Sequence, residues 1–207
     1  MKRGKFITVE GGEGAGKSTM MVRLEEWLKS AGHRVVCTRE PGGTVLAEKL
    51  RDILLDNNNL ALSGQAELLL MFAARAQHLE ELIRPALARG DWVLCDRFTD
   101  ATWAYQGGGR RLPDGDIATL ETLVHDDLQP DLTLLLDLPV EQGLQRASAR
   151  SAADRFEQES RRFFERVREA YLDRARLAPE RFAVIDASRN AENVWSQIES
   201  VLRERLA

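Results

Sequence analysis

The sequence predicts an α/β protein in which a five-stranded parallel β-sheet carries helices on both faces. Short apolar runs alternate along the chain with longer amphipathic stretches, which is the order of strands joined by crossover helices. The runs at 92–95 and 132–138 are apolar along most of their length, as expected for strands buried on both faces of a parallel sheet. No repeat, low-complexity tract or linker interrupts the 207 residues, so we expect one domain spanning 1–207.

The elements are expected in a regular order along the chain. The first strand covers 5–10 and ends in glycines, and a helix with one apolar side begins at Lys17 and closes at Gly32. The polar segment 56–59 is expected to be a loop, and Pro85 is expected to kink a long helix. The other strands are expected at 33–38, 92–95, 132–138 and 183–185, and the other helices at about 45–54, 65–89 and 190–206.

The composition argues against several classes of protein. A net charge of -4 and a pI of about 5.5 provide no electrostatic footprint for nucleic acid. No apolar stretch approaches the ~18 residues of a membrane helix, and the N-terminus carries no long apolar signal, so we expect a cytoplasmic protein without a membrane partner. Cys37 and Cys95 are each expected to be buried in a strand. The separated His33, His78 and His125 form no zinc site, and we expect surface or packing roles for them.

The segment 11–18, Gly-Gly-Glu-Gly-Ala-Gly-Lys-Ser, matches the phosphate-loop pattern G-x-x-x-x-G-K-[ST] at every position. Its glycines let successive backbone N–H groups converge on phosphate oxygens, and the helix that follows adds its positive N-terminal end. Lys17 is expected to bind the β- and γ-phosphates, and Ser18 to bind Mg²⁺. The loop lies between a strand and a helix, so it predicts the P-loop NTPase fold. The residues expected to bind ATP are Gly11, Gly12, Glu13, Gly14, Ala15, Gly16, Lys17, Ser18 and Thr19.

Two aspartates compete for the second magnesium position. Asp96 and Asp137 each end an apolar strand. Asp96 is followed at once by Arg97, which places a charge pair at the carboxyl end of a strand, where open α/β sheets bind ligands. Asp137 precedes Leu138-Pro139 and is suited to cap a helix. We therefore favour Asp96.

Several arginines are placed to surround a second phosphorylated ligand. The chain has no N-K-x-D guanine-reading segment, and Ser63 in the segment Leu62-Ser63-Gly64-Gln65 is interpreted as a helix cap rather than part of a transport-ATPase signature. Arginine forks match phosphate groups bidentately. The candidates are Arg39, Arg75, Arg97 and the pair Arg110-Arg111.

Five further motifs follow one another along the chain. They are Thr38-Arg39-Glu40-Pro41-Gly42-Gly43-Thr44, Phe72-Ala73-Ala74-Arg75-Ala76-Gln77-His78, Asp96-Arg97-Phe98, Ala104-Tyr105-Gln106-Gly107-Gly108-Gly109-Arg110 and Asp154-Arg155-Phe156-Glu157. Together, and in this order, they resemble the motifs of bacterial thymidylate kinases, and the resemblance runs from Phe6 to about Tyr171.

The resemblance implies Mg²⁺-dependent transfer of a phosphoryl group from ATP to dTMP by a homodimer. It implies that Arg39 and Arg97 hold the dTMP phosphate and that Arg75 binds the thymine edge. It also implies that Tyr105 packs by the sugar and disfavours a ribose 2′-OH, while Glu13 meets the 3′-OH. The full set implied for dTMP is Glu13, Arg39, Glu40, Pro41, Met71, Phe72, Arg75, Arg97, Thr102, Tyr105 and Gln106.

The residue that stacks on thymine is left open between two neighbours. Many relatives have a phenylalanine four residues before the pocket arginine, where this chain has Met71, and Phe72 lies three residues before Arg75. Both spacings share one helix face with Arg75, so either side chain could cover the base. Phe72 has the better π-face and Met71 the matching position.

The catalytic positive charge is expected in a lid rather than in the phosphate loop. Some relatives carry an arginine inside the loop, at the position of Gly14 here. The small residues between Arg146 and Arg155 suit a hinged lid at about 146–157, and Arg150 is our first choice for contacting the transferred phosphoryl group, with Arg146 and Arg155 in support. The catalytic residues expected are Lys17, Arg97 and Arg150.

Two alternatives remain beside this interpretation. A deoxynucleoside kinase would need a carboxylate base near a sugar hydroxyl, and Glu40 or Asp96 could serve. The chain could also be a non-catalytic P-loop nucleotide-binding module. Turnover of thymidine, dTMP, dUMP and dCMP with ATP separates these functions.

Overall fold

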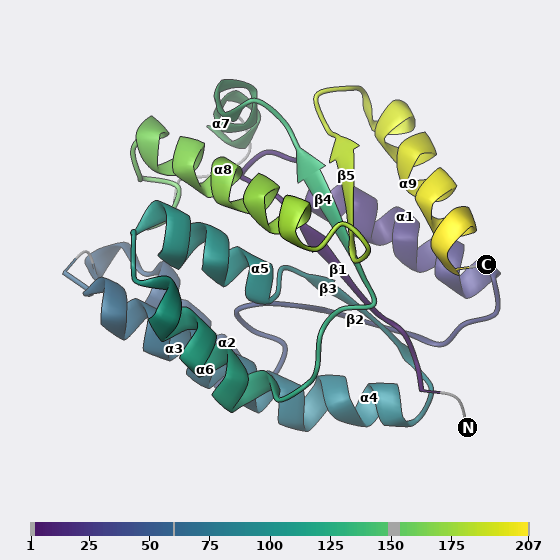
Figure 1. The fold of residues 1–207 in the computed structure, drawn as a ribbon, viewed down its shortest axis with the longest axis horizontal. Helices are drawn as coiled ribbons and strands as arrows, with labels where there is room; N and C mark the ends of the chain where they lie inside the picture. The colour runs from purple at the N-terminus through teal and green to yellow at the C-terminus, as the bar shows by residue number, and fades with distance from the viewer. Residues whose placement is uncertain (1–2, 60, 149–153, 207) are drawn as a thin grey trace.

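A single parallel β-sheet forms the centre of the computed structural model, which describes residues 3–59, 61–148 and 154–206 (Figure 1). The strand order is β2-β3-β1-β4-β5, and all four neighbouring pairs are parallel. This confirms the predicted five-stranded parallel sheet. The strands are β1 (Phe6–Glu10), β2 (Val35–Arg39), β3 (Trp92–Asp96), β4 (Leu132–Asp137) and β5 (Phe182–Asp186).

Helices cover both faces of this sheet (Figure 1). On one face, α1 and α9 pack on apolar residues that alternate along β1 and β4, such as Ile7, Val9 and Leu134. On the other face, the opposite residues Phe6 and Leu135 contact the remaining helices. The helices are α1 (Lys17–Ser30), α2 (Val45–Leu55), α3 (Gly64–His78), α4 (Arg84–Ala88), α5 (Thr99–Thr102), α6 (Asp114–His125), α7 (Val140–Ser148), α8 (Arg161–Leu177) and α9 (Ala191–Leu206), with the short turns η1 (Asn57–Asn59), η2 (Leu79–Ile83) and η3 (Trp103–Gly109).

The long helix predicted at 65–89 exists, but its irregularity lies before Pro85. Ser63 caps the N-terminus of α3 and accepts a hydrogen bond from the Ala66 N–H. The π-helical turn η2 then joins α3 to α4, whose first turn contains Pro85. A proline has no N–H to donate, so the wider turn that precedes it accommodates the missing helical hydrogen bond.

The edge position of β2 explains one wrong prediction. Cys95 on the internal strand β3 is fully buried, as predicted, whereas Cys37 on β2 is exposed. Strand β2 has only β3 as a neighbour, so side chains on its outer side reach solvent. The apolar character of a segment indicates a strand but does not reveal whether that strand lies at an edge.

No helix within the described parts of the chain is long and apolar enough to cross a bilayer.

Candidate active site

The phosphate loop leaves the carboxyl end of β1 and runs into α1, as the sequence predicts. Gly16 adopts a left-handed conformation (φ 89°), after which Lys17 begins the helix. The Lys17 ammonium donates to the carbonyl oxygens of Gly11 and Gly12 at 3.0 and 3.1 Å. Burial, followed by the nearby charge of Arg97, lowers the pKa of Lys17. The lysine is therefore held inside the loop, at the position where phosphate charge would be neutralised.

Gly14 is the point where the loop touches helix α7. Its φ is 69°, and a Cβ atom placed on Gly14 would lie 2.0 Å from the Gly143 carbonyl oxygen. Real Cβ atoms do not approach a carbonyl oxygen this closely. The backbone contact therefore excludes any side chain at position 14 unless α7 moves.

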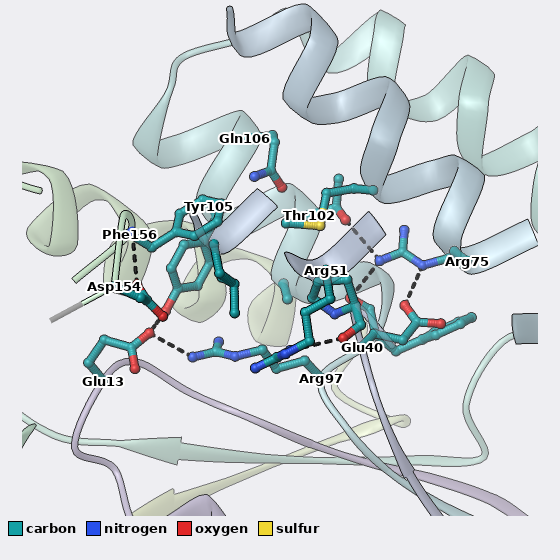
Figure 2. A pocket seen from close by; sticks show the side chains of 15 residues that line it. Glu13, Glu40, Arg51, Arg75, Arg97, Thr102, Tyr105, Gln106, Asp154 and Phe156 are labelled. Atoms are coloured by element: carbon teal, nitrogen blue, oxygen red, sulfur yellow. Dashed lines mark hydrogen bonds and ion pairs between the residues drawn. The ribbon is translucent and has the colours of Figure 1, made fainter. Parts of the chain in front are cut away.

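A cleft opens beside the loop (Figure 2). It joins the loop residue Glu13 to side chains from the ends of β2 and β3 and from helices α2 and α3. Such a crevice at the carboxyl ends of parallel strands is the usual ligand site of open α/β sheets. Its lining residues are Glu13, Glu40, Pro41, Arg51, Leu55, Met71, Arg75, Arg97, Phe98, Ala101, Thr102, Tyr105, Gln106, Asp154 and Phe156.

Arg97 lies at the end of the cleft nearest the loop. It follows β3 directly and has a left-handed backbone (φ 69°), which is uncommon for a residue with a side chain. Its guanidinium donates to the Gly11 carbonyl at 3.0 Å, to the Tyr171 hydroxyl at 3.1 Å and to the Glu13 carboxylate at 2.9 Å. These contacts direct the positive charge of Arg97 toward the phosphate loop.

The second phosphate-binding arginine expected from the sequence, Arg39, does not line this cleft. Arg39 is more than half exposed, and it pairs with Glu48 at 2.9 Å. Arg51 of α2 lines the cleft instead and donates to the Pro41 carbonyl at 2.9 Å. Sequence reasoning missed Arg51, although its spacing from the buried Ala47 and Leu54 places it on the inward face of α2.

The far end of the cleft is built around Arg75 of α3. Its Nε donates to Glu40 at 2.6 Å, and its Nη2 donates to the Phe98 carbonyl at 3.1 Å and to the Thr102 hydroxyl at 2.9 Å (Figure 2). Its Nη1 is buried and has no hydrogen-bond partner among the described residues. Three partners therefore fix the Arg75 guanidinium at this wall of the cleft.

His78 continues this network behind Arg75, contrary to the expectation that no histidine takes part in an assembly. It is fully buried, and its Nδ1 lies 2.9 Å from the Glu40 carboxylate and its Nε2 2.7 Å from the Thr38 hydroxyl. Burial alone would raise the pKa of Glu40, but Arg75 and His78 lower it below its ordinary value. A Cβ at Gly43 would lie 2.4 Å from the His78 ring, so this glycine makes room for the network.

The other two histidines have the packing roles that we expected. His33 stacks on Trp92, with 4.0 Å between the ring centroids. His125 is fully buried and stacks on Phe98 at 4.9 Å, and burial, with a smaller contribution from the charge of Arg75, lowers the pKa of His125 to about 4.

Thr102, Tyr105 and Gln106 line one wall of the cleft because they stand at positions i, i+3 and i+4 along α5 and η3. The Tyr105 hydroxyl donates to Glu13 at 2.7 Å, which joins this wall to the phosphate loop. Burial raises the pKa of Tyr105, so the hydroxyl remains protonated and can act as a donor. The structure thus brings Glu13 and Tyr105 together as the resemblance implies.

Met71 and Phe72 have different surroundings in the structure. Met71 lines the cleft, whereas Phe72 is buried in a cluster with Leu68 and Ile117 and is absent from the cleft wall. The aromatic side chains that line the cleft among the described residues are Phe98, Tyr105 and Phe156. Phe98 directly follows Asp96-Arg97 in the sequence, which could have indicated that it lines the same cleft.

The two candidate magnesium ligands have different surroundings. Asp137 is bound by Arg168, with two hydrogen bonds of 2.7 and 2.8 Å. Asp96 has a buried Oδ1 without a hydrogen-bond partner among the described residues. The described residues contain no group of three or more His, Cys, Asp or Glu side chains placed to hold a metal. Mg²⁺ bound through substrate phosphates and water needs only one or two protein oxygens, and the free oxygen of Asp96 suits it.

The lid arginines Arg146 and Arg155 have different partners in the structure. Arg146 donates to the carbonyls of Ala187 and Ser188 at 2.9 and 3.2 Å. Arg155 is buried, with bonds to the Leu54 carbonyl at 2.7 Å and to Glu67 at 2.6 Å, so these contacts hold it within the protein. Arg150 and the rest of 149–153 lie outside the described residues.

Fold and site together define a P-loop phosphotransferase whose phosphate loop adjoins a separate cleft for an acceptor. The family model for thymidylate kinase matches residues 9–198. The thymidylate kinase of Chromohalobacter salexigens is 61% identical over 209 residues, covering 100% of this chain and 99% of that protein, and that of Alcanivorax borkumensis is 57% identical over 204 residues, covering 99% and 98%. A crystal structure of the Ehrlichia chaffeensis thymidylate kinase superposes with a TM-score of 0.79 at 34% identity and covers 97% of this chain and 99% of that one. The chain belongs to the thymidylate kinase family, and it is an enzyme of the phosphotransferase class.

Proposed function

We infer that the chain transfers the γ-phosphoryl group of ATP to dTMP, giving ADP and dTDP for the supply of dTTP. The observation that carries this inference is the layout of the cleft. Arg97 and Arg51 stand at the end near the phosphate loop, and Arg75 and Gln106 stand at the other end. A nucleotide with its phosphate beside the loop therefore extends its base toward Arg75 and Gln106.

The transfer requires positioning and charge neutralisation rather than a strong base, because the acceptor phosphate oxygen is already anionic. Lys17 is proposed to bind the donor phosphates and Arg97 the acceptor phosphate. The hydrogen bond from Arg97 to Glu13 supports a shared role in holding the reacting groups in line. Arg51 is proposed as the second acceptor-phosphate ligand.

Mg²⁺ is proposed to be held by Ser18 and Asp96. The exposed position of Ser18 at the start of α1 and the unpaired buried oxygen of Asp96 support this assignment. When bound, the ion would supply positive charge that neutralises the donor phosphates.

At the sugar, Glu13 and Tyr105 are proposed to hold the deoxyribose. Their mutual hydrogen bond holds a carboxylate and a tyrosine side by side, across the cleft from Arg75 (Figure 2). Methionine at position 71 is proposed to cover the base from α3, and Phe98 to border it from the opposite strand end.

The lid contribution is proposed to come from Arg150. Arg155 is bound to Glu67, and Arg146 to backbone carbonyls, so neither is as available as a phosphate ligand. The Arg150→Ala variant should lower kcat by roughly 10³-fold while dTMP affinity is nearly kept. An unchanged kcat would move the role to Arg146.

A coupled assay with ATP and thymidine, dTMP, dUMP or dCMP tests the proposed reaction. Turnover of dTMP but not thymidine is expected. Turnover of thymidine without dTMP would indicate a deoxynucleoside kinase, and no turnover of any acceptor would indicate a nucleotide-binding module.

We also propose that the enzyme acts as a homodimer in the cytoplasm. Large apolar side chains of α2 and α3 are exposed, namely Val45, Leu46, Ile53 and Leu69, which suits burial against a second copy. Sedimentation of the wild type should give a dimer, and Leu69→Lys should shift it toward monomer. A wild-type monomer at micromolar concentration would refute the dimer.

A further inference from the structure

The Gln106 side chain lies between the cleft and a buried carboxylate. Gln106 is 1% exposed, and its Nε2 donates to the Glu67 Oε1 at 2.8 Å. The Glu67 carboxylate accepts this hydrogen bond, so the Gln106 amide faces it with its nitrogen, which is the donor of the amide group. The amide oxygen therefore points the other way, toward the cleft, as Figure 2 shows.

Glu67 cannot turn away from this contact. It is fully buried, and Arg110 donates to it at 3.1 and 3.2 Å and Arg155 at 2.6 Å. Arg155 is fixed in turn by its bond to the Leu54 carbonyl. Two arginines thus hold the carboxylate in place.

The fixed amide gives the cleft a directional pattern. Gln106 presents an acceptor, while Arg75 lines the same cleft with a guanidinium group, which carries donors and no acceptor. Thymine and uracil carry the O4 acceptor beside the N3–H donor, which complements this pair. Cytosine carries an amino donor beside an acceptor nitrogen, which opposes both groups.

We propose that Glu67 is a specificity-determining positioning residue that makes the cleft reject cytosine nucleotides. This proposal rests on the proposed function. To accept cytosine, the Gln106 amide would have to reverse, and its oxygen would then face the Glu67 carboxylate with no proton between them. Glu67 thus prevents the one rearrangement that would let the pocket read cytosine.

The test is the ratio of kcat/KM for dTMP to kcat/KM for dCMP. This ratio does not depend on how much of a preparation is folded, so loss of stability alone leaves it unchanged. Hydrogen-bond patterns of this kind discriminate by up to about 10⁴-fold. In Glu67→Gln, the new amide can donate to a reversed Gln106, and the ratio should fall by about 10-fold or more.

Two further variants complete the experiment. Arg110→Gln removes one cation from Glu67 and keeps the Glu67–Gln106 bond, so it should affect both substrates alike and leave the ratio within about 2-fold of the wild type. Gln106→Leu removes the reading group and should also collapse the ratio.

The outcomes are distinct. A wild-type ratio in Glu67→Gln, in a preparation that still phosphorylates dTMP, would overturn the role of Glu67, and so would retained discrimination in Gln106→Leu. Failure of the wild type to phosphorylate dTMP would overturn the proposed function itself.

Discussion

The phosphate loop and the base end of the cleft are built in opposite ways. In the loop, Lys17 is held by carbonyl groups five and six residues away in the chain. At the base end, Arg75 is held by Glu40, Phe98 and Thr102, which are 35, 23 and 27 residues away. The loop is thus a local structure, whereas the base end exists only when strands and helices from distant parts of the chain have packed together.

The strongest way to break the loop is Lys17→Ala. Because Lys17 is proposed to neutralise the donor phosphates, kcat should fall by about 10³-fold or more. Affinity for dTMP, measured by calorimetry, should stay near that of the wild type because the base end is untouched. Lys29→Ala, on the exposed side of the same helix, is the control. Retained transfer in Lys17→Ala would contradict the role of the loop.

A pair of arginine variants tests which residues bind the acceptor phosphate between the two ends. Arg51 lines the cleft and Arg39 does not, so Arg51→Ala should raise the KM for dTMP by about 10-fold. Arg39→Ala should change it by less than about 2-fold. Steady-state kinetics at saturating ATP measure both values. The reverse order would support the phosphate-binding role that the resemblance gave to Arg39.

A smaller effect is expected from substitution of His78, which contacts Glu40 on the side away from the cleft. Glutamine at position 78 can reach Thr38 in place of the ring Nε2 but not Glu40, whereas asparagine can mimic the Nδ1 donor to Glu40. His78→Gln should therefore raise the KM for dTMP by about 5-fold with little change in kcat, and His78→Asn should have a smaller effect. Equal KM values in the two variants would show that Glu40 is positioned without His78.

The smallest effect is expected for Glu10 and concerns the pH dependence of stability. This residue ends β1 and accepts hydrogen bonds from the Phe98 N–H and the Tyr171 hydroxyl, both at 2.7 Å. Burial, and then the charge of Asp100, raises the pKa of Glu10 from 4.5 to about 8. The folded protein therefore retains a proton that the unfolded chain loses between these values, so this contribution to stability is complete below pH 4.5 and is lost as pH rises through 8.

Glu10→Gln removes this titration while keeping an acceptor and a donor. Its unfolding free energy in urea should depend less steeply on pH between 5 and 8 than that of the wild type, by at most about 1.4 kcal/mol per pH unit. The exposed Glu26→Gln serves as the control. Parallel curves for Glu10→Gln and the wild type would show that Glu10 is ionised in the folded protein.

The same contrast explains what could be predicted from the sequence. The strands and the loop follow from local patterns, and they were placed within one or two residues. Arg39 was expected in the cleft because it ends a strand, but the sequence does not reveal to which side an edge strand directs each residue. The sequence carried no signal for Glu67, because a helix-forming glutamate looks the same whether it faces solvent or the two arginines Arg110 and Arg155.

The contact between Gly14 and Gly143 also limits how this enzyme can change over evolution. The relatives that carry an arginine inside the phosphate loop differ at this position, and a single Gly14→Arg substitution looks like a short route between the two arrangements. With the Gly143 carbonyl 2.0 Å from any Cβ at position 14, that route passes through a variant whose loop no longer fits against α7. Placing an arginine in the loop thus requires coordinated changes in two segments, the phosphate loop and α7.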